Sequence, residues 1–190
     1  MMEDIDARLL KPYSPRDTED KIYKLWQESG FFNPDNLPER NKESFSMVLP
    51  PPNVTGRLHL GHTLEHSFQD AVIRFKRMRG YKTLWIPGTD HAAIATQSRF
   101  EKELYAKEKK SRHDFSRDEF FNMIHEFGLE NQKDMQSQMR TLGSSLDWSR
   151  EAFTLDEKRS VAVKTAFKRM HDEGLIYRGF RVVNWDPKGQ

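Results

Sequence analysis

Two histidines and the glycine between them are the residues of this sequence best suited to chemistry. His59, Gly61 and His62 lie in the run His-Leu-Gly-His. The two histidines are three residues apart, so on a helix they share a face, and each imidazole can donate a hydrogen bond to a phosphate oxygen. Gly61 lacks a Cβ, which lets a flat group such as a nucleoside lie against the backbone. The run predicts a nucleotide site in which fixed donors stabilise charge at an attacked α-phosphate. The alternative is a pair of surface histidines at a helix start.

The residues around this run predict the point where a strand passes into a helix. Residues 45–49 are mostly apolar and are typical of a buried strand. Three prolines at 50–52 then stiffen the backbone, and residues 53–56 (Asn-Val-Thr-Gly) predict a turn. From His59 a helix is expected to run to the glycine stop at Gly80. Such a junction collects anions, because free N–H groups and the helix dipole point at it.

The helix after His59 carries an apolar stripe, which we expect to lie in the core. Its members are Leu60, Leu64, Phe68, Ala71, Val72 and Phe75. We interpret His66 as a bystander that binds no ligand. The basic residues near the end of the helix, among them Arg74 and Arg77, match its dipole and are expected to be solvated.

A second strand is predicted over residues 81–86, parallel to the first through a right-handed crossover. It ends at Pro87-Gly88, which places Asp90 at the carboxyl end of a strand, where open parallel sheets bind ligands. A carboxylate there suits an ammonium group, although Asp90 could instead cap the following helix. The neighbouring His91 either bonds the ligand or shapes the loop.

The rest of the chain predicts helices and one more strand. The expected helices span residues 16–29, 92–109, 116–143 and 154–174, and the expected third strand spans residues 180–185. Capping boxes open the last two helices at Ser116 and Thr154. On the first helix, Ile22, Leu25 and Trp26 form the face that we expect to be buried. We therefore predict an α/β fold, a partial doubly wound (Rossmann-like) parallel sheet with flanking helices and an incomplete carboxyl half.

Composition narrows the possible functions. The 190 residues are 36% hydrophobic and 32% charged, with a formal charge of +2 that is too small to attract nucleic acid in bulk. The absence of cysteine excludes disulfides and thiolate metal sites, and we assign no metal ligands. No apolar run reaches the roughly 18 residues that a membrane helix needs, and the first residues do not resemble a secretory signal. We expect a cytoplasmic protein.

Longer runs on both sides of the two histidines resemble a known family. Residues 50–62 read PPPNVTGRLHLGH and residues 77–97 read RMRGYKTLWIPGTDHAAIATQ. Both runs resemble valyl-tRNA synthetases, which are class I aminoacyl-tRNA synthetases, with residues 59–62 in the place of the HIGH signature. Isoleucine and leucine relatives usually carry Trp-Asp-x-His-Gly after Pro-Gly, whereas residues 88–92 match the valine form. Ala93 departs from the family's usual glycine. The runs LDWSR, FTLDE and GLIYRG follow downstream in the family's order.

The resemblance implies an activity and a role for each candidate residue. The enzyme would activate valine with ATP, releasing pyrophosphate, and transfer it from valyl-adenylate to valine tRNA; Mg²⁺ would arrive with ATP. His59 and His62 would contact the phosphates, Gly61 would lie under the adenosine, and Thr55 and Gly56 would shape the phosphate loop. Pro51, Pro52 and Asn53 would wall the valine pocket, with Asp90 on the α-ammonium and His91 beside it. The full-length enzyme would be a monomer that does not bind membranes.

The resemblance also implies that the chain is the amino-terminal part of a longer enzyme. Residues 1–44 would form a leading helix and loop, and residues 45–190 the first half of the class I catalytic domain. Nothing resembles the family's second signature, KMSKS, so we expect the chain to be inactive by itself. Three alternatives stay open: an isoleucyl-tRNA synthetase, a small nucleotidyltransferase, and a non-catalytic fragment that binds ATP, tRNA or a partner subunit. The valine form of residues 88–92 and the chain's length argue against the first two.

Overall fold

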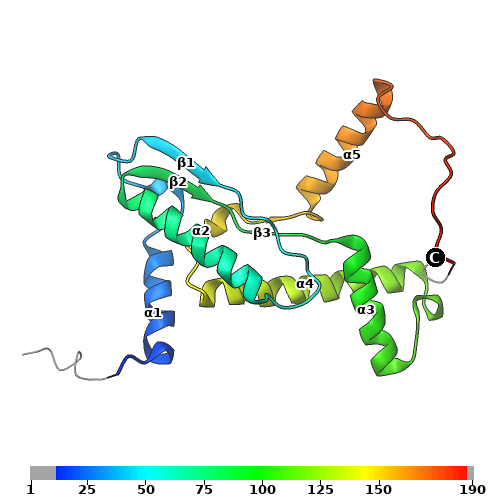
Figure 1. The fold of residues 1–190 in the computed structure, drawn as a ribbon, viewed down its shortest axis with the longest axis horizontal. Coiled ribbons are helices and arrows are strands. Elements are labelled where there is room, and N and C mark those ends of the chain that lie inside the picture. The colour runs from blue at the N-terminus through cyan, green and yellow to red at the C-terminus, as the bar shows by residue number, and fades with distance from the viewer. Residues whose placement is uncertain (1–11, 188–190) are drawn as a thin grey trace, which may run out of the picture. The chain divides into compact units, whose positions relative to one another are not determined.

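The computed structural model describes residues 12–187, and Figure 1 shows their helices and strands in chain order. The α-helices are α1 (Pro15–Glu28), α2 (Leu60–Met78), α3 (Ala93–Glu108), α4 (Arg117–Thr141) and α5 (Glu157–Asp172). The strands are β1 (Glu43–Met47), β2 (Tyr81–Trp85), β3 (Gly88–Thr89) and β4 (Ala152–Phe153), and the short 3-10 helices are η2 (Pro34–Asn36), η3 (Arg112–Asp114) and η4 (Trp148–Arg150). The chain forms two compact units, one ending at Thr154 and one beginning at Leu155.

Two short parallel sheets organise the first unit. β1 pairs in parallel with β2, with Glu43 opposite Tyr81 and Met47 opposite Trp85, and α2 is the crossover helix between them (Figure 1). β3 pairs in parallel with β4. The predicted α/β class with short parallel strands, flanking helices and an incomplete sheet is confirmed. β3 and β4 were not predicted, because two residues are too few to show a period.

The predicted strand at residues 180–185 is wrong for this structure. The segment has no regular secondary structure, and Phe180 and Val182 are fully exposed. Its apolar residues have strand character, but a strand is stable only when a neighbour pairs with its backbone.

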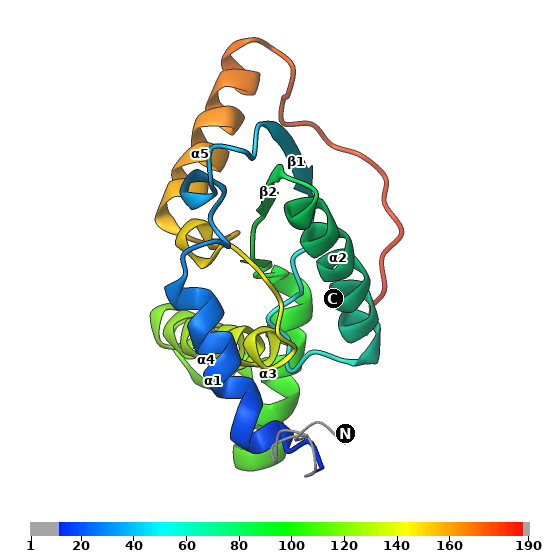
Figure 2. The same ribbon diagram turned by 90° about the vertical axis from the view of Figure 1, so that its left-hand side faces the viewer.

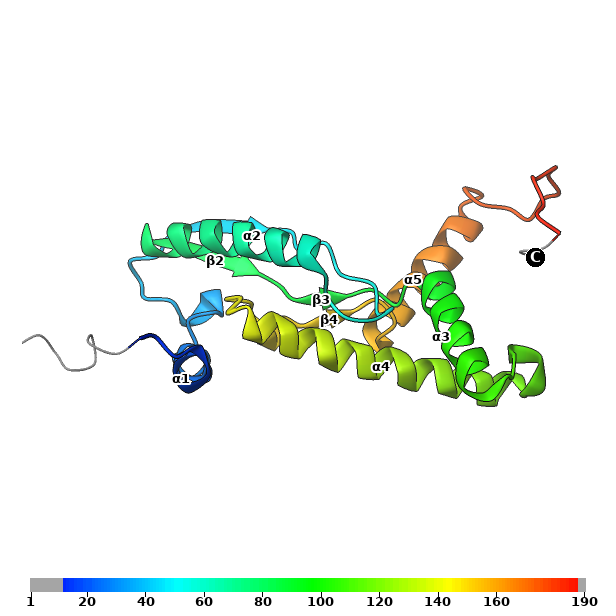
Figure 3. The ribbon, with the colours of Figure 1, turned by 60° about the horizontal axis from the view of Figure 1, so that its bottom comes forward.

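One apolar cluster joins the elements of the first unit. Its buried members are Leu49, Ile73, Trp85, Met139 and Leu146. They come from the chain after β1, from α2, β2 and α4, and from the loop that follows α4. Figure 3 shows α4 running alongside the segments that carry β3 and β4. The core therefore lies where α2, α4 and the β1–β2 pair meet.

The apolar stripe of α2 does not lie in this core, so that prediction is wrong. Leu60, Leu64 and Phe68 are 83%, 72% and 70% exposed, and Phe75 is also exposed. Ala71 is exposed and Val72 is half-buried. The buried side of α2 instead presents His66 and Ile73. Helical spacing identified the apolar side of the helix but not which side this unit covers.

Around buried Ile73, the covered side of α2 also carries polar side chains, and these bind the loop at residues 143–145. Asp70 Oδ1 accepts hydrogen bonds from the Ser145 N–H (2.9 Å) and hydroxyl (2.6 Å). Arg74 donates to the Gly143 carbonyl (2.6 Å), and Arg77 Nη1 lies 3.2 Å from Ser145 Oγ. Nδ1 of buried His66 lies 3.2 Å from the hydroxyl of Ser144, the middle residue of this loop. The expectation that Arg74 and Arg77 are solvated is therefore wrong, because both hold this loop.

The leading helix is anchored by a residue other than those predicted. Ile22 and Leu25 are exposed, whereas Tyr23 is buried. The Tyr23 hydroxyl donates to the Ser144 carbonyl (3.0 Å) and accepts from the Trp148 indole N–H (2.8 Å). These bonds hold α1 to the segment that follows α4. Figure 2 shows α1 next to α4, which it contacts.

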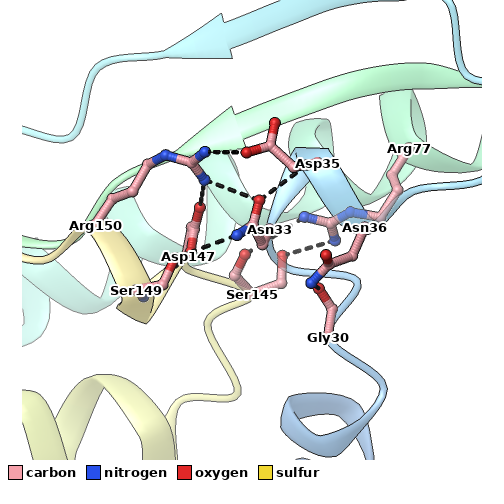
Figure 4. A network of polar contacts seen from close by, with 9 residues as sticks. All are labelled: Gly30, Asn33, Asp35, Asn36, Arg77, Ser145, Asp147, Ser149 and Arg150. Atoms are coloured by element: carbon pink, nitrogen blue, oxygen red, sulfur yellow. Dashed lines mark hydrogen bonds and ion pairs between the residues drawn. The ribbon is translucent and has the colours of Figure 1, made fainter.

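A network around Arg150 fixes η4 to the segment after α1 (Figure 4). The Arg150 guanidinium donates to Asp35 Oδ2 (2.6 Å) and Asn33 Oδ1 (2.9 Å), and it contacts Asp147. Asp147 Oδ1 also accepts from the Ser149 N–H (3.1 Å) and caps η4. Bonding to Asp147 and then to Asp35 raises the pKa of Arg150. The LDWSR run therefore has a structural role in joining two parts of the first unit.

The exposed stripe leads to a prediction for the isolated 190-residue chain. We expect it to bind a hydrophobic dye such as ANS, because α2 presents contiguous apolar side chains to solvent. The double substitution Leu64→Glu and Phe68→Glu should abolish most of the dye fluorescence with little change in Tm. The matched control Ile73→Ala should lower the free energy of unfolding by about 3 kcal/mol, because Ile73 is buried. A chain that binds no dye and melts cooperatively as a monomer would contradict this exposure.

Candidate functional site

A pocket of about 280 Å³ lies where the proline-rich turn meets the start of α2. Its lining residues are Pro50, Pro51, Pro52, Asn53, Thr55, Arg57, His59, His62, Glu65 and Met135. Six of these residues were predicted for the site: three in the amino-acid wall, Thr55 in the phosphate loop, and both histidines. The structure therefore brings together the phosphate-contacting and wall-forming candidates. Arg57 and Glu65 were missed, because single charged residues beside a helix start carry no pattern of their own.

The two histidines cap the amino-terminal end of α2 reciprocally. His59 is the N-cap residue, and its Nδ1 accepts a hydrogen bond from the Gly61 N–H (3.1 Å). His62 Nδ1 accepts in turn from the His59 N–H (3.2 Å). The two rings stack with their centroids 3.9 Å apart. The backbone N–H groups of His59 and Gly61 therefore hold the two imidazoles in place, although free N–H groups at this junction were expected to meet an anion.

This cap determines which ring nitrogens are available to a ligand. Because both Nδ1 atoms accept hydrogen bonds, each neutral ring carries its proton on Nε2. The Nε2–H groups of His59 and His62 are then the donors left for a phosphate. Burial, and then the neighbouring His59 ring, lower the pKa of His62 below its ordinary 6.5, although Glu65 opposes the change. The neutral donor form of His62 is thus favoured near pH 7.

Gly61 does not line the pocket, but the cap depends on it. A Cβ added there would lie 2.9 Å from His59 Cε1 and 3.0 Å from His59 Nδ1. Any side chain at this position would push the capping ring away. Gly56 also lies outside the lining, and no other heavy atom would come within 4 Å of a Cβ added there.

The proline-rich turn is bonded directly to the loop that carries Asp90. The Asp90 N–H donates to the Pro52 carbonyl (2.8 Å), and the Val54 N–H donates to the Asp90 carbonyl (2.9 Å). Asn53 and Asp90 thereby form an isolated parallel bridge. Asp90 lies outside the lining of the pocket but is bonded to its wall. The predicted placement of Asp90 at the carboxyl end of the sheet is confirmed.

Asp90 and His91 are held by bonds within the first unit. Asp90 Oδ1 accepts from the Ala92 N–H (3.1 Å) and from the Thr154 hydroxyl (2.9 Å). The His91 ring packs edge-on against Phe153, with centroids 6.3 Å apart, and like Asp90 it lies outside the pocket lining. Burial lowers the pKa of His91, against the opposing effect of Asp90. Asp90 therefore bonds the backbone just before α3 but does not cap the helix, because the N-cap of α3 is Ala92 and no side chain caps it. The capping alternative for Asp90 is thus wrong.

The family departure at Ala93 falls where glycine is not required. Ala93 is the first residue of α3 and is exposed. The left-handed conformation at the start of α3 belongs to Ala92, whose φ is 47°. An alanine in regular helix has no steric conflict, so this departure leaves the loop after Asp90 intact.

Amide side chains of α4 support both loops of the site. Asn131 donates to the Val54 carbonyl (3.0 Å), and Gln138 Oε1 accepts from the Leu58 N–H (2.8 Å). Gln132 donates to the Thr89 hydroxyl (2.9 Å). These residues were not predicted. Asn131, Met135 and Gln138 share one helix face, but the sequence does not indicate which distant loop that face meets.

Among residues 12–187, no group of three or more His, Asp or Glu side chains is arranged to hold a metal ion. Mg²⁺ prefers oxygen ligands, and Glu65 is the carboxylate in the pocket lining. In the same part of the chain, no helix has the length and apolar character needed to cross a membrane.

The reciprocal cap makes a prediction for NMR. With ring-¹⁵N histidine, His59 and His62 should both show the Nε2–H tautomer, and His62 should titrate below pH 6.5. The folded state then binds fewer protons than the unfolded state, so His62 stabilises the fold above pH 6.5 and this contribution is lost as pH falls through its lowered pKa. In His62→Gln, which does not titrate, the free energy of unfolding should fall less on acidification. A Nδ1–H tautomer, or titration above 6.5, would refute the cap.

Comparison with known proteins agrees with the fold and with the resemblance. Residues 21–190 match the family described as tRNA synthetases class I (I, L, M and V). A valine–tRNA ligase of Corynebacterium diphtheriae is 50% identical over 180 residues, which cover 95% of this chain and 19% of that protein. The crystal structure of the ternary complex of Agrobacterium radiobacter K84 agnB2 LeuRS, tRNA and LeuAMS shares the fold, with a TM-score of 0.77 at 24% identity over 94% of this chain and 21% of that one. The chain thus spans about a fifth of the length of these relatives. It belongs to the class I tRNA synthetase family.

Proposed function

We propose that this chain is the amino-terminal part of the catalytic domain of a valine–tRNA ligase. The full enzyme joins valine to ATP, releases pyrophosphate, and transfers the valyl group from valyl-adenylate to valine tRNA. The observation that carries the proposal is the pocket in which two reciprocally capped imidazoles face a proline-rich wall bonded to Asp90. The 50% identity to a valine–tRNA ligase supports valine as the substrate.

The phosphate side of the pocket is made by the start of α2. In adenylate formation the valine carboxylate attacks the α-phosphorus, and the bond to pyrophosphate breaks. Negative charge grows on the phosphate oxygens, and the Nε2–H groups of His59 and His62 are oriented in advance to bond them. Arg57 in the pocket lining adds a permanent positive charge. Thr55 and Gly56 shape the loop, and Gly61 leaves room for the capping ring on one side and for adenosine on the other.

The amino-acid side is made by the proline-rich turn and Asp90. Pro51, Pro52 and Asn53 form a stiff wall, because prolines hold the backbone in one conformation. Asp90 receives the α-ammonium through Oδ2, since both of its partners among the described residues bond Oδ1. His91 closes the loop beside it. The protein performs little covalent chemistry itself and accelerates the reaction by positioning and charge stabilisation.

The same proposal gives the substrates of the full-length enzyme, its cellular location and its oligomeric state. ATP, valine and valine tRNA are the substrates, and Mg²⁺ comes with ATP. We propose a cytoplasmic, monomeric full-length enzyme, in keeping with the family resemblance. The 190-residue chain alone is expected to be inactive, because it spans about a fifth of its relatives' length and has no segment resembling KMSKS.

The phosphate role predicts a large effect of His62→Ala in the full-length enzyme. Losing a donor that acts in the transition state should slow adenylate formation by about 10²-fold or more. The measurement is the rate of valine-dependent pyrophosphate–ATP exchange at saturating substrates. The control is His113→Ala, in η3 and outside the pocket lining, which should leave the rate unchanged. If His62→Ala changes only the KM for valine, the proposed role is wrong.

The ammonium role predicts a different change for Asp90→Asn. This variant should raise the KM for valine far more than the KM for ATP, because it removes the charge that meets the ammonium group. Exchange is measured with valine, isoleucine and leucine in turn. Equal losses for valine and ATP would assign Asp90 a purely structural role, and faster exchange with isoleucine than with valine in the unmodified enzyme would reject the proposed specificity.

A further inference from the structure

The Thr154 hydroxyl lies between the Asp90 carboxylate and the loop that follows it. Its Oγ1 donates to Asp90 Oδ1 (2.9 Å) and accepts from the His91 N–H (2.8 Å). The Ala92 N–H donates to the same Oδ1 (3.1 Å). The hydroxyl therefore acts as donor and acceptor at once, which no apolar side chain can do.

The backbone at Thr154 is itself fixed by the short β3–β4 sheet. The Thr154 N–H donates to the Thr89 carbonyl (3.2 Å), one residue after Phe153 pairs with Thr89. Gln132 of α4 bonds the Thr89 hydroxyl. The backbone that carries Oγ1 is therefore held by its bond to Thr89, and the Thr89 side chain is held in turn by α4.

Thr154 is available for this contact because it does not cap a helix. We predicted a capping box at Thr154, but the residue that caps α5 is Asp156, whose carboxylate accepts from the Arg159 N–H (2.8 Å). That prediction is wrong by two residues. By contrast, the capping box predicted at Ser116 is confirmed. Thr154 thus contacts a residue 64 positions away in the sequence instead of its own helix.

We propose that Thr154 is a positioning residue for amino-acid binding, holding Asp90 by Oδ1 so that Oδ2 faces the substrate ammonium. This inference rests on the proposed function, in which Asp90 binds that group. The terminal torsion of an aspartate is broad, so a carboxylate held by one bond samples several orientations. Two donors on the same oxygen restrict that torsion. The orientation is therefore established before the substrate binds.

Two variants of the full-length enzyme separate this role from packing. Thr154→Val keeps the shape and removes the hydroxyl, whereas Thr154→Ser keeps the hydroxyl and removes a methyl group. In pyrophosphate–ATP exchange, Thr154→Val should raise the KM for valine about tenfold, the effect of one bond to a charged group. The KM for ATP and the kcat should change less than about twofold, because the phosphate side keeps its contacts. Thr154→Ser should behave as the unmodified enzyme. Should Thr154→Val fail to fold, Thr154→Ala carries the same expectation.

A valine analogue without the ammonium group separates a positioning role from a packing role. A loss of packing would weaken valine and the analogue alike, whereas a misplaced Asp90 should weaken only valine. The hydroxy acid analogue of valine should inhibit Thr154→Val and the unmodified enzyme equally, so selectivity for valine over the analogue falls in the variant. In an Asp90→Ala background, Thr154→Val should add little further loss.

The outcomes separate this inference from the proposed function. If Asp90→Ala raises the KM for valine but Thr154→Val does not, the positioning role is overturned and the proposed function stands. Equal losses of valine and ATP affinity in Thr154→Val, or a full additional loss in the Asp90→Ala background, also overturn it. If Asp90→Ala leaves the KM for valine unchanged, both proposals fail.

Discussion

Two backbone hydrogen bonds between the proline-rich turn and the Asp90 loop hold the candidate site together. They run from the Asp90 N–H to the Pro52 carbonyl and from the Val54 N–H to the Asp90 carbonyl. The first loop leads into the capped histidines and the second carries the carboxylate. Without these bonds, the two halves of the site would lie on separate surface loops, which are the more mobile parts of most proteins. A reaction that depends on positioning tolerates little such motion.

Polar side chains from distant elements make this junction rigid. Asn131 and Gln138 of α4 bond the backbone after the prolines, and Thr154 bonds Asp90. The reciprocal cap orients both imidazoles with the chain's own N–H groups. Apolar packing contributes less here: among the residues that the structure describes, the buried apolar cluster is small, and the apolar side of α2 remains exposed. The site is thus supported largely by hydrogen bonds that fix direction, which apolar contacts do not.

The sequence predicted the elements around the site and their first parallel pairing well, but not which distant side chains contact one another. The parallel β1–β2 pair, the helix beginning at His59 and the position of Asp90 follow from short patterns of apolar residues, prolines and glycines, and all are confirmed. We predicted that the apolar side of α2 is buried, but the structure buries the opposite side. Periodicity shows that a helix has an apolar face but not which partner covers which face. The roles of Tyr23 and Thr154 were missed for a related reason. Each depends on a residue more than 60 positions away, which a pattern within one element cannot indicate.

Native-state hydrogen exchange tests most directly whether the two loops are joined as described. In the full-length enzyme without substrates, the amide protons of Val54 and Asp90 donate the two bridging bonds. We expect both to be protected to a degree comparable with amides of β2, because opening either bond requires separating the turn from the sheet edge. Exchange of both amides as fast as that of an exposed loop would show that the halves of the site move independently, and the preformed pocket would not exist.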